Sequence, residues 1–139
     1  MRRILVLEDN RLERKFLMNI LSRKFGNRYT IDEASEGSEA VHLLSNNDYQ
    51  LVITDLVMPG KIEGMDLIRT CLKKYPEIPI IAISGNQPFY LYLAKRLGVK
   101  AVFTKPLDIE LFIHTSEQLL SELLPENRNN EGHNVSSIK

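Results

Sequence analysis

The sequence has one cysteine, no excess of charge of either sign and no long apolar run. A lone Cys71 cannot form an internal disulfide, which suits a reducing compartment, so we expect a cytoplasmic protein. Basic and acidic residues both number 18, so nothing favours direct nucleic-acid binding, and a protein partner or small ligand is expected instead. The apolar runs are too short for a signal peptide or a bilayer span, so the protein should be soluble, without membrane insertion.

The 139 residues suit one domain that is large enough to bury a core. The period of the apolar residues switches five times from that of a strand to that of a helix. The predicted strands are 3–7, 29–34, 51–55, 78–83 and 100–104. The predicted helices run from 12 to a stop near 26, over 38–44, 65–75 and 88–97, and from a cap at Asp108 to about 124. This alternation predicts an α/β fold, a doubly wound parallel sheet with helices on both faces. We expect the domain over 1–124 and a flexible polar tail over 125–139.

Four of the five strands are followed at their carboxyl ends by residues that can do chemistry. These are Glu8 with Asp9, then Asp55, Ser84 and Lys105. Each is ordinary alone, because acidic pairs are usually solvated, a strand-ending Asp or Ser often caps a turn or helix, and Lys-Pro often makes a turn. Carboxyl ends of parallel strands share one edge, however, and three crowded carboxylates need a cation such as Mg²⁺. A hydroxyl and an ammonium beside that ion suit the oxygens of a phosphoryl group.

This set of residues, with the Met58-Pro59 pair that follows Asp55 and with Pro106 after Lys105, resembles the receiver (CheY-like) domain of two-component response regulators over about 3–124. The resemblance implies a flavodoxin-like (βα)5 fold with strand order 2-1-3-4-5. It implies that Asp55 is the phospho-acceptor and that Ser84 and Lys105 contact the phosphoryl group. It also implies a Mg²⁺ site formed by Glu8, Asp9, Asp55 and the main-chain carbonyl of Val57.

The function that the resemblance implies is a step in a phosphorelay. A histidine kinase or phosphotransfer protein would phosphorylate Asp55 with the help of Mg²⁺, and the altered domain would signal by protein contact. We expect no enzyme activity beyond self-catalysed gain and loss of the phosphoryl group. The expected output face is the helix 88–97, the strand 100–104 and the last helix, with Phe89, Tyr90, Tyr92 and the 109–113 run. A homodimer is also considered.

Three other functions remain to be weighed. A shuttle that passes its phosphoryl group to a histidine phosphotransfer protein is the main alternative. A phosphohydrolase with an Asp55 nucleophile is less favoured, since Val57 stands where such an enzyme has a second acid. A flavin or nucleotide module is disfavoured, because the acidic residues after the first strand would repel phosphates.

Two departures from the family pattern affect the site. The loop over 60–63 has one residue more than the commonest spacing, which bears on metal geometry and phosphate lifetime. Val102 stands where an aromatic residue is common, and Phe103, one position later, should face the other side of the strand. We therefore expect Ser84 and Val102 to form an altered switch pair, in which Val102 keeps its rotamer.

Overall fold

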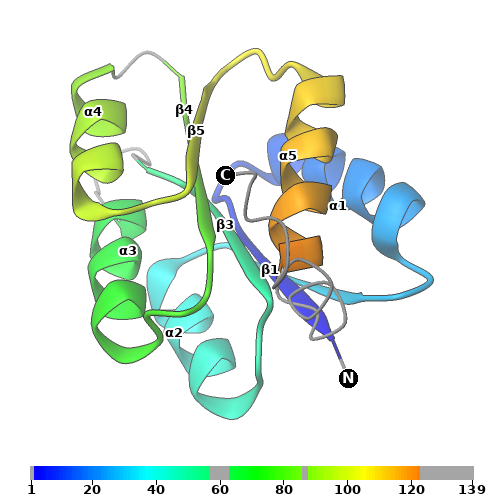
Figure 1. The fold of residues 1–139 in the computed structure, drawn as a ribbon, viewed down its shortest axis with the longest axis horizontal. Coiled ribbons are helices and arrows are strands. Elements are labelled where there is room, and N and C mark those ends of the chain that lie inside the picture. The colour runs from blue at the N-terminus through cyan, green and yellow to red at the C-terminus, as the bar shows by residue number, and fades with distance from the viewer. Residues whose placement is uncertain (1, 57–62, 86–87, 123–139) are drawn as a thin grey trace, which may run out of the picture.

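The computed structural model describes residues 2–56, 63–85 and 88–122, which form one five-stranded parallel sheet covered by helices (Figure 1). The strand order is β2-β1-β3-β4-β5. The strands are β1 (Arg3–Leu7), β2 (Thr30–Ala34), β3 (Leu51–Asp55), β4 (Ile80–Ser84) and β5 (Ala101–Thr104). The doubly wound α/β fold and the flavodoxin-like order are both confirmed.

The helices lie in two layers, with α1 and α5 on one face of the sheet and α2, α3 and α4 on the other (Figure 1). Their bounds are α1 (Arg11–Phe25), α2 (Gly37–Asn46), α3 (Glu63–Lys74), α4 (Pro88–Leu97) and α5 (Ile109–Glu122). Asp108 caps α5 as predicted, since its Oδ1 accepts from the Leu111 N–H at 3.1 Å. The boundary at 124 and the tail over 125–139 lie outside the described residues.

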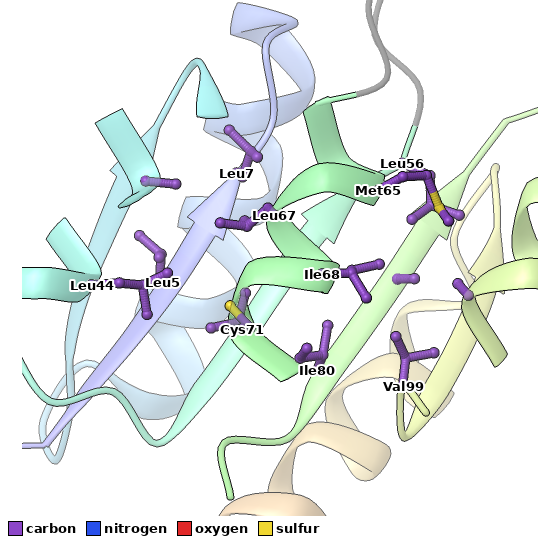
Figure 2. Close-up of a cluster of buried hydrophobic side chains, with 14 of the residues drawn as sticks. Leu5, Leu7, Leu44, Leu56, Met65, Leu67, Ile68, Cys71, Ile80 and Val99 are labelled. Carbon is purple, nitrogen blue, oxygen red and sulfur yellow. The ribbon is translucent and has the colours of Figure 1, made fainter. Parts of the chain in front are cut away.

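The central strands are apolar throughout because both of their faces are covered. In β1, Leu5 and Leu7 pack into the cluster under α2, α3 and α4, whereas Ile4 and Val6 pack into the cluster under α1 and α5. Figure 2 shows the first cluster, to which α3 contributes the side chain of Cys71. Cys71 is fully buried, as predicted for a core thiol, and burial raises its pKa to about 11.

The start of α3 is fixed closely against the end of β3. A Cβ atom on Gly64 would clash with the carbonyl oxygen of Asp55 and the Cα of Leu56. Only glycine allows this approach of two backbone segments. The sequence around Gly64 therefore helps to place the main chain that carries Asp55.

None of the helices in the described part of the chain combines the length and the apolar character needed to cross a bilayer.

Candidate functional site

The strand ends bring the predicted acidic residues together. Asp55 ends β3, and Glu8 and Asp9 follow the neighbouring β1, which pairs with β3 from Ile4 to Leu7. One carboxylate oxygen from each of these three residues lies within 4.8 Å of the others. Glu8 and Asp55 are buried, and Asp9 is half-buried. The arrangement places three acidic groups at one edge of the sheet.

Lys105, which follows β5, reaches the same cluster. Its Nζ lies 3.2 Å from Asp55 Oδ2 and 3.3 Å from Glu8 Oε1. Its backbone N–H donates to the Ser84 carbonyl at 3.0 Å, which fixes the Lys105 backbone beside the end of β4. Strands β1, β3, β4 and β5 thus all contribute to one site, as the sequence predicts.

Ser84 is buried at this edge, and its hydroxyl has no partner within the ranges 2–56, 63–85 and 88–122. Among the described residues, Ser84 Oγ is the buried side-chain polar atom that makes no hydrogen bond. A buried polar group left unpaired costs about 1–3 kcal/mol, so such a group calls for an explanation. A ligand oxygen that arrives at the site would supply the missing partner.

Burial and charge together shift the pKa values of the ionisable groups. Burial and the negative charge of Asp55 raise the pKa of Glu8 above its usual range. Burial also raises the pKa of Asp55, and the positive charge of Lys105 offsets this only in part. Burial alone would lower the pKa of Lys105, but the carboxylates of Glu13, Asp55 and Glu8 outweigh it, so this pKa lies above its ordinary value.

The segment that carries Glu8 and Asp9 is held by Arg14, a residue that the strand-end pattern does not indicate. Arg14 Nη1 donates to the Glu8 carbonyl at 2.9 Å, and its Nε donates to Glu33 Oε1 at the same distance. This guanidinium connects α1, the end of β1 and β2. An arginine five residues after an acidic pair is visible in the sequence, but its contacts with the Glu8 carbonyl and the Glu33 carboxylate depend on the fold, which no sequence pattern specifies.

Glu13 is a second residue of the site that the strand-end pattern does not indicate. Its carboxylate contacts Lys105 Nζ, although the two residues are 92 positions apart. Asn10 and Glu13 have the spacing of a capping box, which indicates a helix start but not a contact with Lys105.

Of the two departures from the family pattern, the structure describes the one at Val102. Val102 packs with the cluster under α2, α3 and α4, whereas Phe103 packs on Phe112 in the opposite cluster, with ring centroids 5.6 Å apart. Phe103 therefore does not replace an aromatic residue at position 102. Val57 and the loop over 60–62 lie outside the described residues.

The acidic cluster has the chemistry of a site for a hard divalent cation. Three carboxylates this close, two of them buried, repel one another unless positive charge lies between them. Mg²⁺ prefers oxygen ligands and needs few protein groups, because waters complete its octahedron. The residues therefore fit Mg²⁺, with Glu8, Asp9 and Asp55 as the groups that would hold it.

Comparison with known proteins agrees with this geometry. The family model described as the response regulator receiver domain matches residues 4–117. The chain belongs to this family. Among solved structures, this receiver domain is similar to that of NtrX from Brucella abortus, with a TM-score of 0.77 and 26% identity over 87% of this chain and 99% of the other. It is also similar to the response regulator TrrA from Thermotoga maritima in complex with Mg²⁺ and BeF, with a TM-score of 0.74 and 28% identity over 86% of this chain and 99% of the other.

Among curated proteins, the receiver domain is similar to parts of larger ones. It is 34% identical over 116 residues to the CAI-1 autoinducer sensor kinase/phosphatase CqsS of Vibrio cholerae, covering 81% of this chain and 16% of that protein. It is 30% identical over 124 residues to the uncharacterized transcriptional regulatory protein YesN of Bacillus subtilis, covering 88% of this chain and 33% of that protein. The chain thus spans a third or less of the length of these relatives.

Proposed function

We propose that this receiver domain accepts a phosphoryl group on Asp55 and signals through the resulting change in conformation. The observation that carries the proposal is the position of Asp55. It lies buried beside Glu8 and Asp9, within 3.2 Å of the Lys105 ammonium, at the sheet edge where Ser84 Oγ lacks a partner among the residues that the structure describes. A nucleophile, a cation site, a positive charge and a hydroxyl at one site suit phosphoryl transfer, in which charge on the transferring group must be stabilised.

The reaction follows from the roles of these side chains. An Asp55 carboxylate oxygen attacks phosphorus, and the bond from phosphorus to the donor breaks, so the donor leaves with the electron pair. Lys105 neutralises negative charge on the transferring group, and positioning with electrostatics supplies most of the rate. Mg²⁺, when held by Glu8, Asp9 and Asp55 and by the predicted carbonyl of Val57, would add positive charge at the phosphoryl oxygens. The product is an aspartyl phosphate, whose oxygens Ser84 and Lys105 then contact.

The donor that we propose is a histidine kinase or a histidine phosphotransfer protein, and the recipient is a protein that contacts the α4, β5 and α5 face. Phe89 and Tyr92 on α4 are exposed, as are Ile109 and Leu111 on α5. Phe112 is fully buried, so it belongs to the core and not to this face. A homodimer and the absence of further enzyme activity stay predictions.

The direct test is phosphorylation with acetyl phosphate and Mg²⁺, followed by intact mass. The wild-type protein should gain one phosphoryl group, and Asp55→Asn should gain none, because an amide is not a nucleophile for phosphorus. Glu77→Gln, in the turn before β4 at the other edge of the sheet, serves as a control and should label like the wild type. Undiminished labelling of Asp55→Asn would contradict the proposal.

A second candidate function is onward transfer of the phosphoryl group to a histidine phosphotransfer protein. Similarity to a segment of the sensor kinase/phosphatase CqsS favours it, because a receiver domain that forms a minor part of a sensor kinase has further phosphotransfer steps after it. Mixing labelled protein with histidine phosphotransfer proteins would distinguish the two functions. A shuttle loses its label to the added protein, whereas a terminal receiver keeps it.

A further inference from the structure

Lys105 is shared by three carboxylates, and one of them, Glu13, lies outside the set of strand-end residues. Glu13 is on the first turn of α1, and its Oε1 contacts Lys105 Nζ. The same Nζ lies 3.3 Å from Glu8 and 3.2 Å from Asp55. The position of the ammonium therefore depends on a helix as well as on the sheet edge.

The carboxylate of Glu13 is available for this contact because another residue performs its usual local task. In a capping box, the acidic residue three positions after the N-cap accepts from the N-cap backbone N–H. Here Asn10 is the N-cap, and its Oδ1 accepts from the Glu13 N–H at 3.0 Å. The Asn10 N–H, however, donates to Glu8 Oε2 at 3.1 Å. Glu8 thus completes the cap, and Glu13 is left to pair with Lys105.

The three carboxylates differ in their exposure. The side chains of Glu8 and Asp55 are 2% and 7% exposed, whereas that of Glu13 is 47% exposed. Glu13 and Lys105 also line a cavity of about 290 Å³ whose other walls include Phe16, Leu17, Pro106 and Leu107. Apolar walls reduce the screening of the pair by water, and so strengthen its interaction.

These contacts have opposite consequences for a cation and for a phosphoryl donor. The negative charge of Glu13 offsets the positive charge of Lys105, and this positive charge would otherwise repel Mg²⁺ from the acidic cluster. The same charge repels an anionic phosphoryl donor and competes with its oxygens for the Lys105 ammonium. Repulsion of the donor and competition for the ammonium both slow phosphorylation. Removal of Glu13 should therefore speed phosphorylation and weaken Mg²⁺ binding.

From this geometry we propose that Glu13 is a positioning residue that holds the Lys105 ammonium toward α1, which favours cation binding and restrains phosphorylation of Asp55. The proposal rests on the proposed function of Asp55. It assigns a role in setting the rate to a residue that need not touch the phosphoryl group.

The test compares Glu13→Gln and Glu13→Ala with the wild type by two measurements at low ionic strength. The Mg²⁺ dissociation constant is taken from an NMR shift titration with the metal alone, and the phosphorylation rate is taken with acetyl phosphate at saturating Mg²⁺. We expect Mg²⁺ affinity to fall about two- to fivefold and the rate to rise about two- to fivefold, as for the loss of a partly exposed ion pair. Glu13→Ala should show the larger change, since glutamine can still accept a hydrogen bond.

The control is Glu77→Gln, which removes the same charge at the opposite edge of the sheet and should change neither quantity. The midpoint of thermal unfolding of each variant shows that the fold is retained. A merely structural role for Glu13 would move both measurements in the unfavourable direction or leave both unchanged, and either result would overturn the proposal.

Failure of the proposed function is distinguishable from failure of this inference. If the wild type gains no Asp55-dependent phosphoryl group, the proposed function is wrong, and the Mg²⁺ titration still tests Glu13. If the wild type is phosphorylated and the two Glu13 variants behave like it, only the role of Glu13 is wrong.

Discussion

Ser84 has a buried hydroxyl without a partner in the described part of the chain, and it lies on the strand next to that of Asp55, the proposed acceptor. It ends β4, whose register pairs Asp55 with Ile83 and Ser84 with Thr104. Val102, two residues before Thr104, packs with the apolar cluster under α4. A bound phosphoryl group would draw the Ser84 hydroxyl toward it, and the space vacated by serine is smaller than that vacated by threonine. Val102 has few χ1 choices and can stay in place.

We predict that activation changes the segment from Ser84 to the start of α4 while Val102 keeps its rotamer. Methyl NMR spectra with and without beryllofluoride and Mg²⁺ check this. The Val102 methyl signals should shift little, whereas the signals of Leu91 in α4 should shift clearly. Gly85 is exposed and has open space around it, so it can absorb a change in the backbone. The adjoining positions 86 and 87 lie outside the described residues.

The control for this prediction is Val102→Ala, which should remain phosphorylated and should still bind a partner of the activated form. Large shifts of the Val102 methyls beside unchanged Leu91 signals would show that the switch runs through β5. Loss of partner binding in Val102→Ala with phosphorylation intact would lead to the same conclusion.

Single residues were predictable where their position followed from a strand end. Asp55, Lys105 and the acidic pair could be named because parallel strands deliver their carboxyl ends to one edge. Glu13 and Arg14 could not, because their contacts depend on how α1 crosses that edge. The spacing of residues along one element does not contain this information.

The joint between β3 and α3 is the element-scale feature that most directly supports the backbone of Asp55, the proposed acceptor. Gly64 lies against the main chain of Asp55 and Leu56 with no room for a side chain. Any larger residue must push α3 away from β3 or displace the strand end. Either movement would alter the Asp55 backbone.

We therefore predict that Gly64→Ala lowers the free energy of unfolding by about 1–3 kcal/mol, as expected for overpacking in a closely packed region. Urea unfolding followed by circular dichroism measures this, and acetyl phosphate labelling should slow in parallel. The matched control is Gly85→Ala, because a Cβ there meets nothing within 4 Å. Its unfolding free energy should stay within about 0.5 kcal/mol of the wild-type value. Equal effects of the two substitutions would contradict this account.

The elements themselves were largely predictable because the period of the apolar residues differs between strand and helix. The limits shifted slightly, as in β4, which begins at Ile80 and not at Ile78. The Pro79 carbonyl accepts from the Val52 N–H, but proline has no N–H to return, so regular pairing starts one residue later. The strand order came from the family resemblance, since periodicity does not state which strands are neighbours.

At the scale of the whole molecule, a formally neutral chain concentrates three carboxylates at one edge. This local excess opposes folding when no cation is bound. A ligand that binds only the folded chain stabilises it in proportion to the logarithm of its concentration, by about 1.4 kcal/mol at tenfold excess over the dissociation constant.

We predict that Mg²⁺ at this excess raises the midpoint of thermal unfolding by several degrees, and that a chelator reverses the shift. Differential scanning calorimetry measures both. Asp9→Ala should lose most of the shift and most of the phosphorylation, whereas Glu77→Gln should keep both. A shift of equal size in Asp9→Ala would place the cation elsewhere.

The sheet is a single layer between two apolar clusters that share no side chains. Ser84 and Val102 connect the site with the layer of α4, and Glu13 connects it with the layer of α1. The effects of substitutions in one layer on the free energy of unfolding should therefore add to those of substitutions in the other, with little coupling. During evolution, the surface over α1 and the surface over α4 can consequently change independently of each other, while the sheet edge with Glu8, Asp9 and Asp55 keeps the same chemistry.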